Sequence, residues 1–303
     1  MKSIGVMVLF ATACGTAGEV SSTPLELSAA LPTTTWVAMT PEVSQPPAAE
    51  LLSCVRLGAS TFGALTHKIA ADADGVLSGV LGEVHNITST PPTAVAPGRA
   101  VWGPIPARNS SVYRLSVAEP APAEFRFVLD GRDPKNDWRG VLAGATFVRD
   151  AAHRTGQIVV DFAVMHALDA STDPVEGLVT LHFDVNGPAR SVAATFAGIR
   201  GKSAPQPEDS AYALVTAADH TSGFAYSTHV DFDGDGTPDE LAHIDSQWTA
   251  AGAGVAHLIV SGGSLGTRVV NATECWDSSL SRLFYKDDAA MHPAVGDISC
   301  CPR

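Results

Sequence analysis

Val179-Thr-Leu-His-Phe-Asp-Val185 alternates apolar and polar side chains over its whole length. Successive side chains of an extended strand point to opposite faces, so this segment has one apolar face and one face made by Thr180, His182 and Asp184. Asn186-Gly187-Pro188 follows, and these residue types favour a tight turn. The segment therefore predicts a half-buried strand that ends in a hairpin.

The same period of two recurs from about residue 100 to the end of the chain. Further alternating segments lie at 125–129, 158–164, 224–232, 241–248, 255–260 and 279–285. Turn-forming pairs separate them at 130–131, 155–156 and 251–252. About ten or eleven short strands are expected, mostly joined by hairpins. One apolar and one polar face per strand indicate an antiparallel sheet.

Upstream of these strands, the apolar residues change to helical spacing. A helix from about 48 to 72 is predicted by apolar residues three, four or seven positions apart: Leu51, Val55, Phe62, Leu65 and Ile69. A second helical piece at 76–84 ends before Pro91-Pro92. We therefore expect a mainly β fold, in which an N-terminal helix precedes an antiparallel β-meander curved into a half-barrel or barrel. A β-sandwich is the alternative.

The composition limits the classes of function. The chain has 303 residues, 19 Lys and Arg, 32 Asp and Glu, and a net charge of -13. An acidic chain without a basic cluster is a poor partner for nucleic acid or anionic headgroups. The hydrophobic fraction of 45% argues against intrinsic disorder.

The first residues read as an export signal. Lys2 precedes a short uncharged run, and Ala11-Thr12-Ala13-Cys14 follows. The run is about half the roughly 20 apolar residues that a membrane span needs, so 1–13 is predicted to be a cleaved signal peptide. The residues before Cys14 resemble the lipobox of bacterial lipoproteins, although Ala11 stands where that family usually has Leu. An ordinary secretory signal with an incidental Cys is the alternative.

The lipobox resemblance implies lipidation of Cys14 and anchoring to a membrane through acyl chains such as palmitate. Gly15 follows, and the absence of Asp at this position favours the outer over the inner membrane. The Pro-, Thr- and Ser-rich segment 14–47 is predicted to be a tether, although some of its apolar residues are expected to lie on the domain. Residues 48–303 are then a single folded domain.

Four further Cys remain for an oxidising compartment: Cys54, Cys275, Cys300 and Cys301. A bond between the adjacent Cys300 and Cys301 would be strained. We expect Cys275 to pair with one of them and Cys54 with the other; a buried free thiol at Cys54 is the alternative.

An acidic loop at 231–240 is the sharpest internal motif. Oxygen-bearing residues occupy every second position and Gly236 the sixth, as a Ca²⁺ loop requires: Asp231, Asp233, Asp235, Thr237 and Asp239. The motif resembles the loops of EF-hands, dockerins and thrombospondin type 3 repeats. Ala242 stands where an EF-hand has a bidentate Glu, and Glu240 and Asp245 are the candidates to replace it. We expect a structural Ca²⁺ site in a hairpin loop; a solvated acidic turn is the alternative.

Gly262-Gly-Ser264-Leu-Gly266 matches the G-x-S-x-G pattern of hydrolases. That motif needs a helix after the serine, whereas the next residues read as a strand, so a glycine-rich hairpin turn is the better interpretation. Glu274-Cys275-Trp276-Asp277 is predicted to place a disulfide beside a packed aromatic side chain.

Residues 48–303 also resemble uncharacterised lipoproteins of myxobacteria and similar soil bacteria. The resemblance rests on Val101-Trp-Gly-Pro104, the acidic loop and the segment 274–277, and it implies no activity. We therefore expect a non-enzymatic lipoprotein with a binding or envelope-structural role. A carrier of a lipid or other apolar ligand inside a half-barrel is the first alternative, and a hydrolase using Ser264 is the weaker one.

Overall fold

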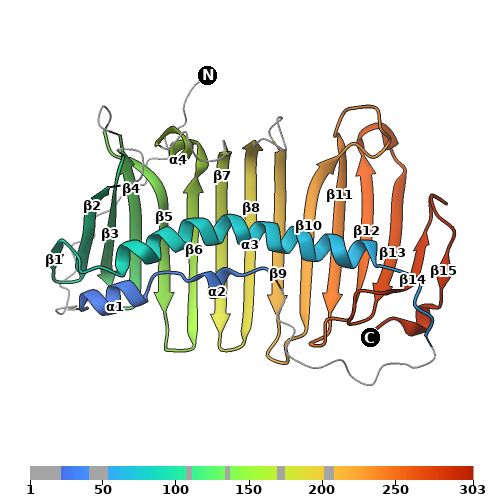
Figure 1. Ribbon diagram of the computed structural model, residues 1–303, viewed down its shortest axis with the longest axis horizontal. Coiled ribbons are helices and arrows are strands. Elements are labelled where there is room, and N and C mark those ends of the chain that lie inside the picture. Colours follow the sequence, from blue (N-terminus) through green and yellow to red (C-terminus); the bar gives the residue numbers. More distant parts are fainter. Residues whose placement is uncertain are drawn as a thin grey trace.

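The computed structural model describes residues 22–40, 54–106, 111–133, 137–168, 175–200 and 208–302. The predicted signal peptide (1–13) and the predicted lipidation site Cys14 lie outside the described residues. The described chain forms one broad antiparallel sheet with helices on one of its faces (Figure 1).

Each strand of the sheet pairs with the next along the chain. The strands are β1 (Ala94–Ala96), β2 (Arg99–Pro106), β3 (Val112–Ala121), β4 (Glu124–Arg132), β5 (Arg139–Val148), β6 (His153–Asp161), β7 (Glu176–Asn186), β8 (Ala189–Arg200), β9 (Glu208–Thr216), β10 (Ser222–Val230), β11 (Glu240–Trp248), β12 (Gly254–Gly262), β13 (Val269–Trp276), β14 (Arg282–Asp287) and β15 (Val295–Gly296). The sheet is open, with β1 and β15 at its edges. The predicted antiparallel meander is confirmed, and closure into a barrel is not seen in the described strands.

A single long helix, α3 (Thr61–Thr88), runs across the strands (Figure 1). Its 28 residues correspond to about 42 Å. The residues buried against the sheet repeat every three or four positions: Phe62, Thr66, Ala70, Ala73, Leu77, Val80, Leu81, Val84 and Ile87. This apolar stripe meets the apolar face of the strands, and the two bury each other.

Both ends of α3 are tied to the sheet. At its start, the Ser60 hydroxyl accepts a hydrogen bond from the Gly63 N–H at 2.8 Å. The buried Glu274 carboxylate on β13 accepts from Ser60 and from the Phe62 N–H at 2.9 Å. A carboxylate there is favoured by the partial positive charge of a helix N-terminus. Beyond the other end, the Trp102 indole N–H donates to the Thr90 carbonyl at 2.9 Å.

Three shorter helices complete the fold: α1 (Pro24–Ala29), α2 (Thr34–Val37) and α4 (Phe162–Leu168). Leu27, Val37 and Met39 are fully or almost fully buried in the main core. Residues 22–40 of the expected tether therefore belong to the folded domain, as their apolar side chains suggested.

Two disulfides join the C-terminus to the rest of the domain. Cys54 bonds to Cys300, and Cys275 bonds to Cys301. The expected pattern is confirmed, and Cys54 is not a free thiol. Trp276 beside Cys275 is completely buried, which confirms the predicted packing at segment 274–277.

Several sequence-based boundaries were wrong. Residues 54–60 are not helical and Val55 is 72% exposed, so the helix begins later than expected and the two predicted pieces are one helix. The strand predicted over 158–164 ends at Asp161, where the Asp161 carboxylate accepts from the Val164 N–H and α4 begins. Asp161 thus acts as a helix cap that the alternating pattern concealed.

The pairs 130–131 and 155–156 are not turns but lie inside strands β4 and β6. Their glycines serve side-chain packing. A Cβ on Gly156 would lie 2.5 Å from the Phe183 ring, and one on Gly131 would lie 2.3 Å from the Leu168 side chain. A glycine in a strand marks such close approaches as well as turns.

Candidate functional site

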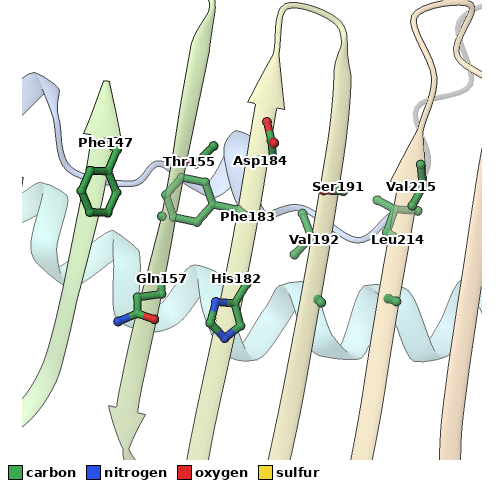
Figure 2. A pocket seen from close by; sticks show the side chains of 13 residues that line it. Phe147, Thr155, Gln157, His182, Phe183, Asp184, Ser191, Val192, Leu214 and Val215 are labelled. Carbon is green, nitrogen blue, oxygen red and sulfur yellow. The ribbon is translucent and has the colours of Figure 1, made fainter. Parts of the chain in front are cut away.

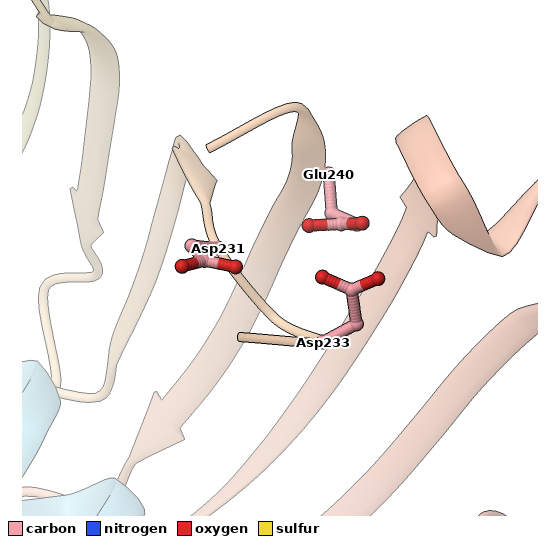
Figure 3. A group of neighbouring side chains, drawn as sticks. All are labelled: Asp231, Asp233 and Glu240. Carbon is pink, nitrogen blue, oxygen red and sulfur yellow. The ribbon is translucent and has the colours of Figure 1, made fainter. Parts of the chain in front are cut away.

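The loop between β10 and β11 gathers carboxylates. Asp231, Asp233 and Glu240 each bring one oxygen atom within 4.8 Å of the others (Figure 3). The predicted ligands Asp231 and Asp233 are therefore brought together. Glu240, one of the two residues expected to replace the bidentate Glu of an EF-hand, lies beside them. Asp245, the other, lies on β11 and contacts His243 instead.

The loop is shaped by its own hydrogen bonds. The Asp231 carboxylate accepts from the N–H groups of Gly234 and Gly236, both at 2.9 Å. Gly236 has a φ of 90°, a conformation that L side chains rarely adopt. The Asp233 carboxylate accepts from the Asp235 N–H at 3.1 Å, and the Asp235 carboxylate accepts from the Thr237 N–H at 2.7 Å.

Asp235 and Asp239, two further predicted ligands, lie outside this carboxylate group. The backbone carbonyl of Thr237, the atom that position 7 of a Ca²⁺ loop uses, accepts a hydrogen bond from the Asp239 N–H at 2.9 Å. The Asp239 carboxylate is packed against Gly263, where a Cβ would lie 2.2 Å from Oδ1. Desolvation raises the pKa of Asp239, and the neighbouring charge of Glu240 adds to the rise. Asp239 thus faces the β12–β13 turn.

Glu240 is the most constrained member of the group, because it is fully buried. Its carboxylate accepts from the Ser264 hydroxyl at 2.6 Å and from the Phe232 N–H at 3.0 Å. The Ser264 hydroxyl, followed by the Phe232 N–H, lowers the pKa of Glu240. The three clustered groups thus present negative charge and oxygen atoms, the ligand type that Ca²⁺ requires.

Ser264 has no nucleophile elbow. It lies in a short 3₁₀ helix, η1 (Gly263–Leu265), and the strand β13 follows where the hydrolase motif needs a helix. Its hydroxyl donates to Glu240. The expected glycine-rich turn is the arrangement found here.

A second polar group lies on the helix-free face. The Ser227 hydroxyl is 2.6 Å from His243 Nδ1, and His243 Nε2 is 3.0 Å from the Asp245 carboxylate. The order resembles a Ser-His-Asp arrangement, but both strands are interior members of the sheet. Their N–H groups serve the strand ladders, so this flat surface offers no pair of free N–H donors for an oxyanion.

The helix-free face also carries a trough over β5–β9, with a volume of about 490 Å³. Figure 2 views the trough with α3 behind the sheet. Three of its lining residues, Phe183, Val192 and Leu214, have buried side chains that belong to the core on the covered face and border the trough from below. Register places Phe147, Thr155, Asp184, Ser191 and Val215 in one row across the five strands.

A second row crosses the same strands and supplies the floor of the trough. It contains Gln157, His182, Ala193 and Ala213. The two alanines are short, and the space above them forms the hollow. The alternating pattern of each strand predicts which face a side chain lies on. Which side chains of different strands lie beside one another depends on the register of successive strand pairs, and that register creates this site.

The polar lining has few partners of its own. Among the described residues, the side chains of Thr155, Gln157, His182 and Ser191 form no hydrogen bond, while Asp184 lies 3.3 Å from His153 Nε2. These donors and acceptors face solvent over the trough. A ligand with complementary polar groups would replace water there without breaking protein contacts.

By contrast, the layer between α3 and the sheet is filled by side chains. Leu77, Leu81, Leu181 and Phe224 are all less than 5% exposed and belong to one continuous core. An apolar ligand in that layer would have to displace core side chains.

No family model matches the chain, and no curated protein or solved structure is significantly similar to it. None of the described helices is long and apolar enough to cross a membrane.

Proposed function

We propose that this protein is an exported, lipid-anchored binding protein whose ligand occupies the trough on the helix-free face of the sheet. The observation that carries the proposal is the hollow itself, together with the lining side chains of Thr155, Gln157 and His182, which form no hydrogen bond within the described part of the chain. Pockets that combine apolar walls with a few free polar groups are the usual form of ligand sites.

Export is supported by the disulfides and by the N-terminal sequence. Two disulfides persist in oxidising compartments rather than in the cytosol of most organisms. The resemblance of segment 11–14 to a lipobox supplies the anchor. Cys14 is the one cysteine outside these two bonds.

The anchor is tested by Cys14→Ser in a bacterial host that processes lipoproteins. We expect the wild-type chain to incorporate labelled palmitate and to sediment with membranes, and the variant to lose the label. Equal labelling of both proteins, or none in either, would contradict the anchor. Outer- and inner-membrane fractions are then separated to test the expected outer-membrane location.

The binding role is tested by thermal shift of the purified full-length chain against sugars, peptides, fatty acids and nucleotides. Phe147→Ala changes the trough, and Val269→Ala is the matched control, because both side chains are exposed to a similar extent (49% and 46%). A ligand whose stabilisation is lost only in Phe147→Ala supports the role. If every ligand acts equally on both variants, the trough is not the site.

We also propose that the acidic loop binds a structural Ca²⁺ ion. Asp231, Asp233 and Glu240 would supply carboxylate oxygens, and the ion would relieve their mutual repulsion. In calorimetry, Ca²⁺ should bind the wild-type chain and raise its melting temperature, and Asp233→Asn should abolish both effects. Asp219→Asn, in another turn, is the control. Absence of heat and of stabilisation in the wild-type chain would refute the site.

A further inference from the structure

The trough presents one exposed phenyl ring beside a row of polar side chains, because Phe183, the other phenylalanine of its lining, is buried. The Phe147 side chain stands at the β5 end and is 49% exposed. Its flat apolar face carries partial negative charge, which attracts the weakly positive C–H groups of a saturated ring. A pyranose sugar has such C–H groups on one face and hydroxyls around its edge.

The polar lining matches hydroxyl groups rather than ions. Gln157 offers both a donor and an acceptor, Thr155 and Ser191 carry hydroxyls, and His182 has one nitrogen of each kind when neutral. Lys and Arg are absent from the side chains that line this trough, and Asp184 adds negative charge. An anionic polymer would therefore find no counter-charge here.

The shape favours an extended ligand. The trough spans five strands, so Phe147 and Val215 stand about 19 Å apart at the usual strand spacing. An acyl chain lying there would cover the free polar groups without bonding to them, which costs free energy. A peptide in extended form gains most at a sheet edge, where backbone groups are unpaired.

We infer that the trough binds a neutral glycan chain, with a sugar ring stacked on Phe147 and hydroxyls bonded to Gln157 and His182. Ala193 and Ala213 leave room for the sugars above the floor of the trough. This inference rests on the proposed binding role and names its ligand class.

The test is affinity electrophoresis of the full-length chain in gels containing xylan, laminarin, hydroxyethylcellulose or glycol chitin, followed by calorimetry with the matching oligosaccharide. Heparin and oleate serve as anionic and apolar probes. Two variants change the site in different ways: Phe147→Ala removes the ring on which a sugar would stack, and Ala213→Leu fills the space above the floor of the trough. Val269→Ala is the control on the same face, and circular dichroism checks that each variant is folded.

We expect at least one neutral glycan to retard the wild-type and Val269→Ala chains, and both trough variants to bind it roughly tenfold more weakly or worse. If heparin or oleate alone shows trough-dependent binding, the binding role stands and the glycan inference is overturned. If no probe responds to the trough variants, both are overturned.

Discussion

The two faces of the sheet carry different residues and differ in how much they are buried. Phe127 on β4 points toward α3 and is 1% exposed, whereas Phe147 on the neighbouring β5 points away and is 49% exposed. On the covered face, apolar side chains from distant strands meet α3 in a single core. On the open face, polar and small side chains lie beside scattered apolar ones such as Phe147, Val215 and Ile259, and all three of these are exposed to solvent. Burial of apolar side chains is thus concentrated on one face, and the proposed binding site lies on the other.

The largest expected effect is on the covered face. Phe127→Ala should lower the free energy of unfolding by about 3–5 kcal/mol, because it leaves a cavity in the core. Its ring fills the space above Gly144, where a Cβ would lie 2.4 Å from the ring. Urea denaturation measures the change. A loss below about 1 kcal/mol would mean that this face is not the stabilising one.

Loss of the disulfide between Cys54 and Cys300 should have the second largest effect on stability. Replacing both residues by Ala should lower the free energy of unfolding by about 2–4 kcal/mol, since the bond closes a long loop in the unfolded chain. The sequence separation is 246 residues, against 26 for Cys275–Cys301, so the corresponding Cys275 and Cys301 double variant should lose less. Melting curves compare the two variants, and the reverse order would contradict the loop-entropy argument.

Loss of the N-terminal cap of α3 should lower the free energy of unfolding by less than loss of the disulfide does. Ser60→Ala removes the acceptor of the Gly63 N–H and should destabilise the protein by about 1 kcal/mol. Ser78→Ala, on the exposed side of α3, is the matched control and should be neutral or slightly stabilising. Equal denaturation midpoints for the two variants would show that the start of α3 does not depend on this cap.

Lowering the pH should destabilise the folded protein, because His67 on the covered face becomes protonated. Burial against Trp248 lowers the pKa of His67, so the unfolded chain binds a proton more readily. The stability contributed by neutral His67 is complete above about pH 6.5 and is lost as the pH falls through the lowered pKa. His67→Phe should therefore melt with a shallower pH dependence between pH 7 and 5. An unchanged slope would assign that dependence to other groups.

The smallest expected stability change is on the open face. Phe147→Ala should alter the free energy of unfolding by less than about 1 kcal/mol, because half of the side chain is already hydrated. Urea denaturation beside Phe127→Ala makes this a comparison of the same substitution on opposite faces. Similar losses in both variants would show that the two faces contribute equally to stability.

Much of the fold could be predicted, and the errors have local causes. Alternation identified strands such as β7 and β10. The number and spacing of cysteines predicted that Cys54 and Cys275 each bond to one of the adjacent Cys300 and Cys301, and the structure decides which. The pattern failed at Phe162, where the Asp161 cap starts a helix, and at Gly156, where glycine serves the Phe183 ring. In both cases a tertiary or capping contact outweighed the local signal.

The candidate sites divide in the same way. The acidic loop is local, so Asp231 and Asp233 could be identified from their spacing, and Glu240 was among the expected substitutes; Asp235 and Asp239 have the same spacing but lie outside the carboxylate group. The trough is non-local, because Phe147, His182 and Val215 lie far apart in the chain and meet through successive strand pairings. No short-range pattern could show that they share one hollow.

The period of two in the sequence determined the antiparallel β class, the hairpin connections and the two faces of the strands that it marks, because each depends on neighbours along the chain. Whether the sheet closes, where α3 crosses it and which polar side chains converge depend on packing between distant segments. Those features arise from strand twist, register and the burial of the helix stripe, which are properties of the assembled molecule. The open face, and with it the proposed binding site, therefore exists only in the tertiary structure.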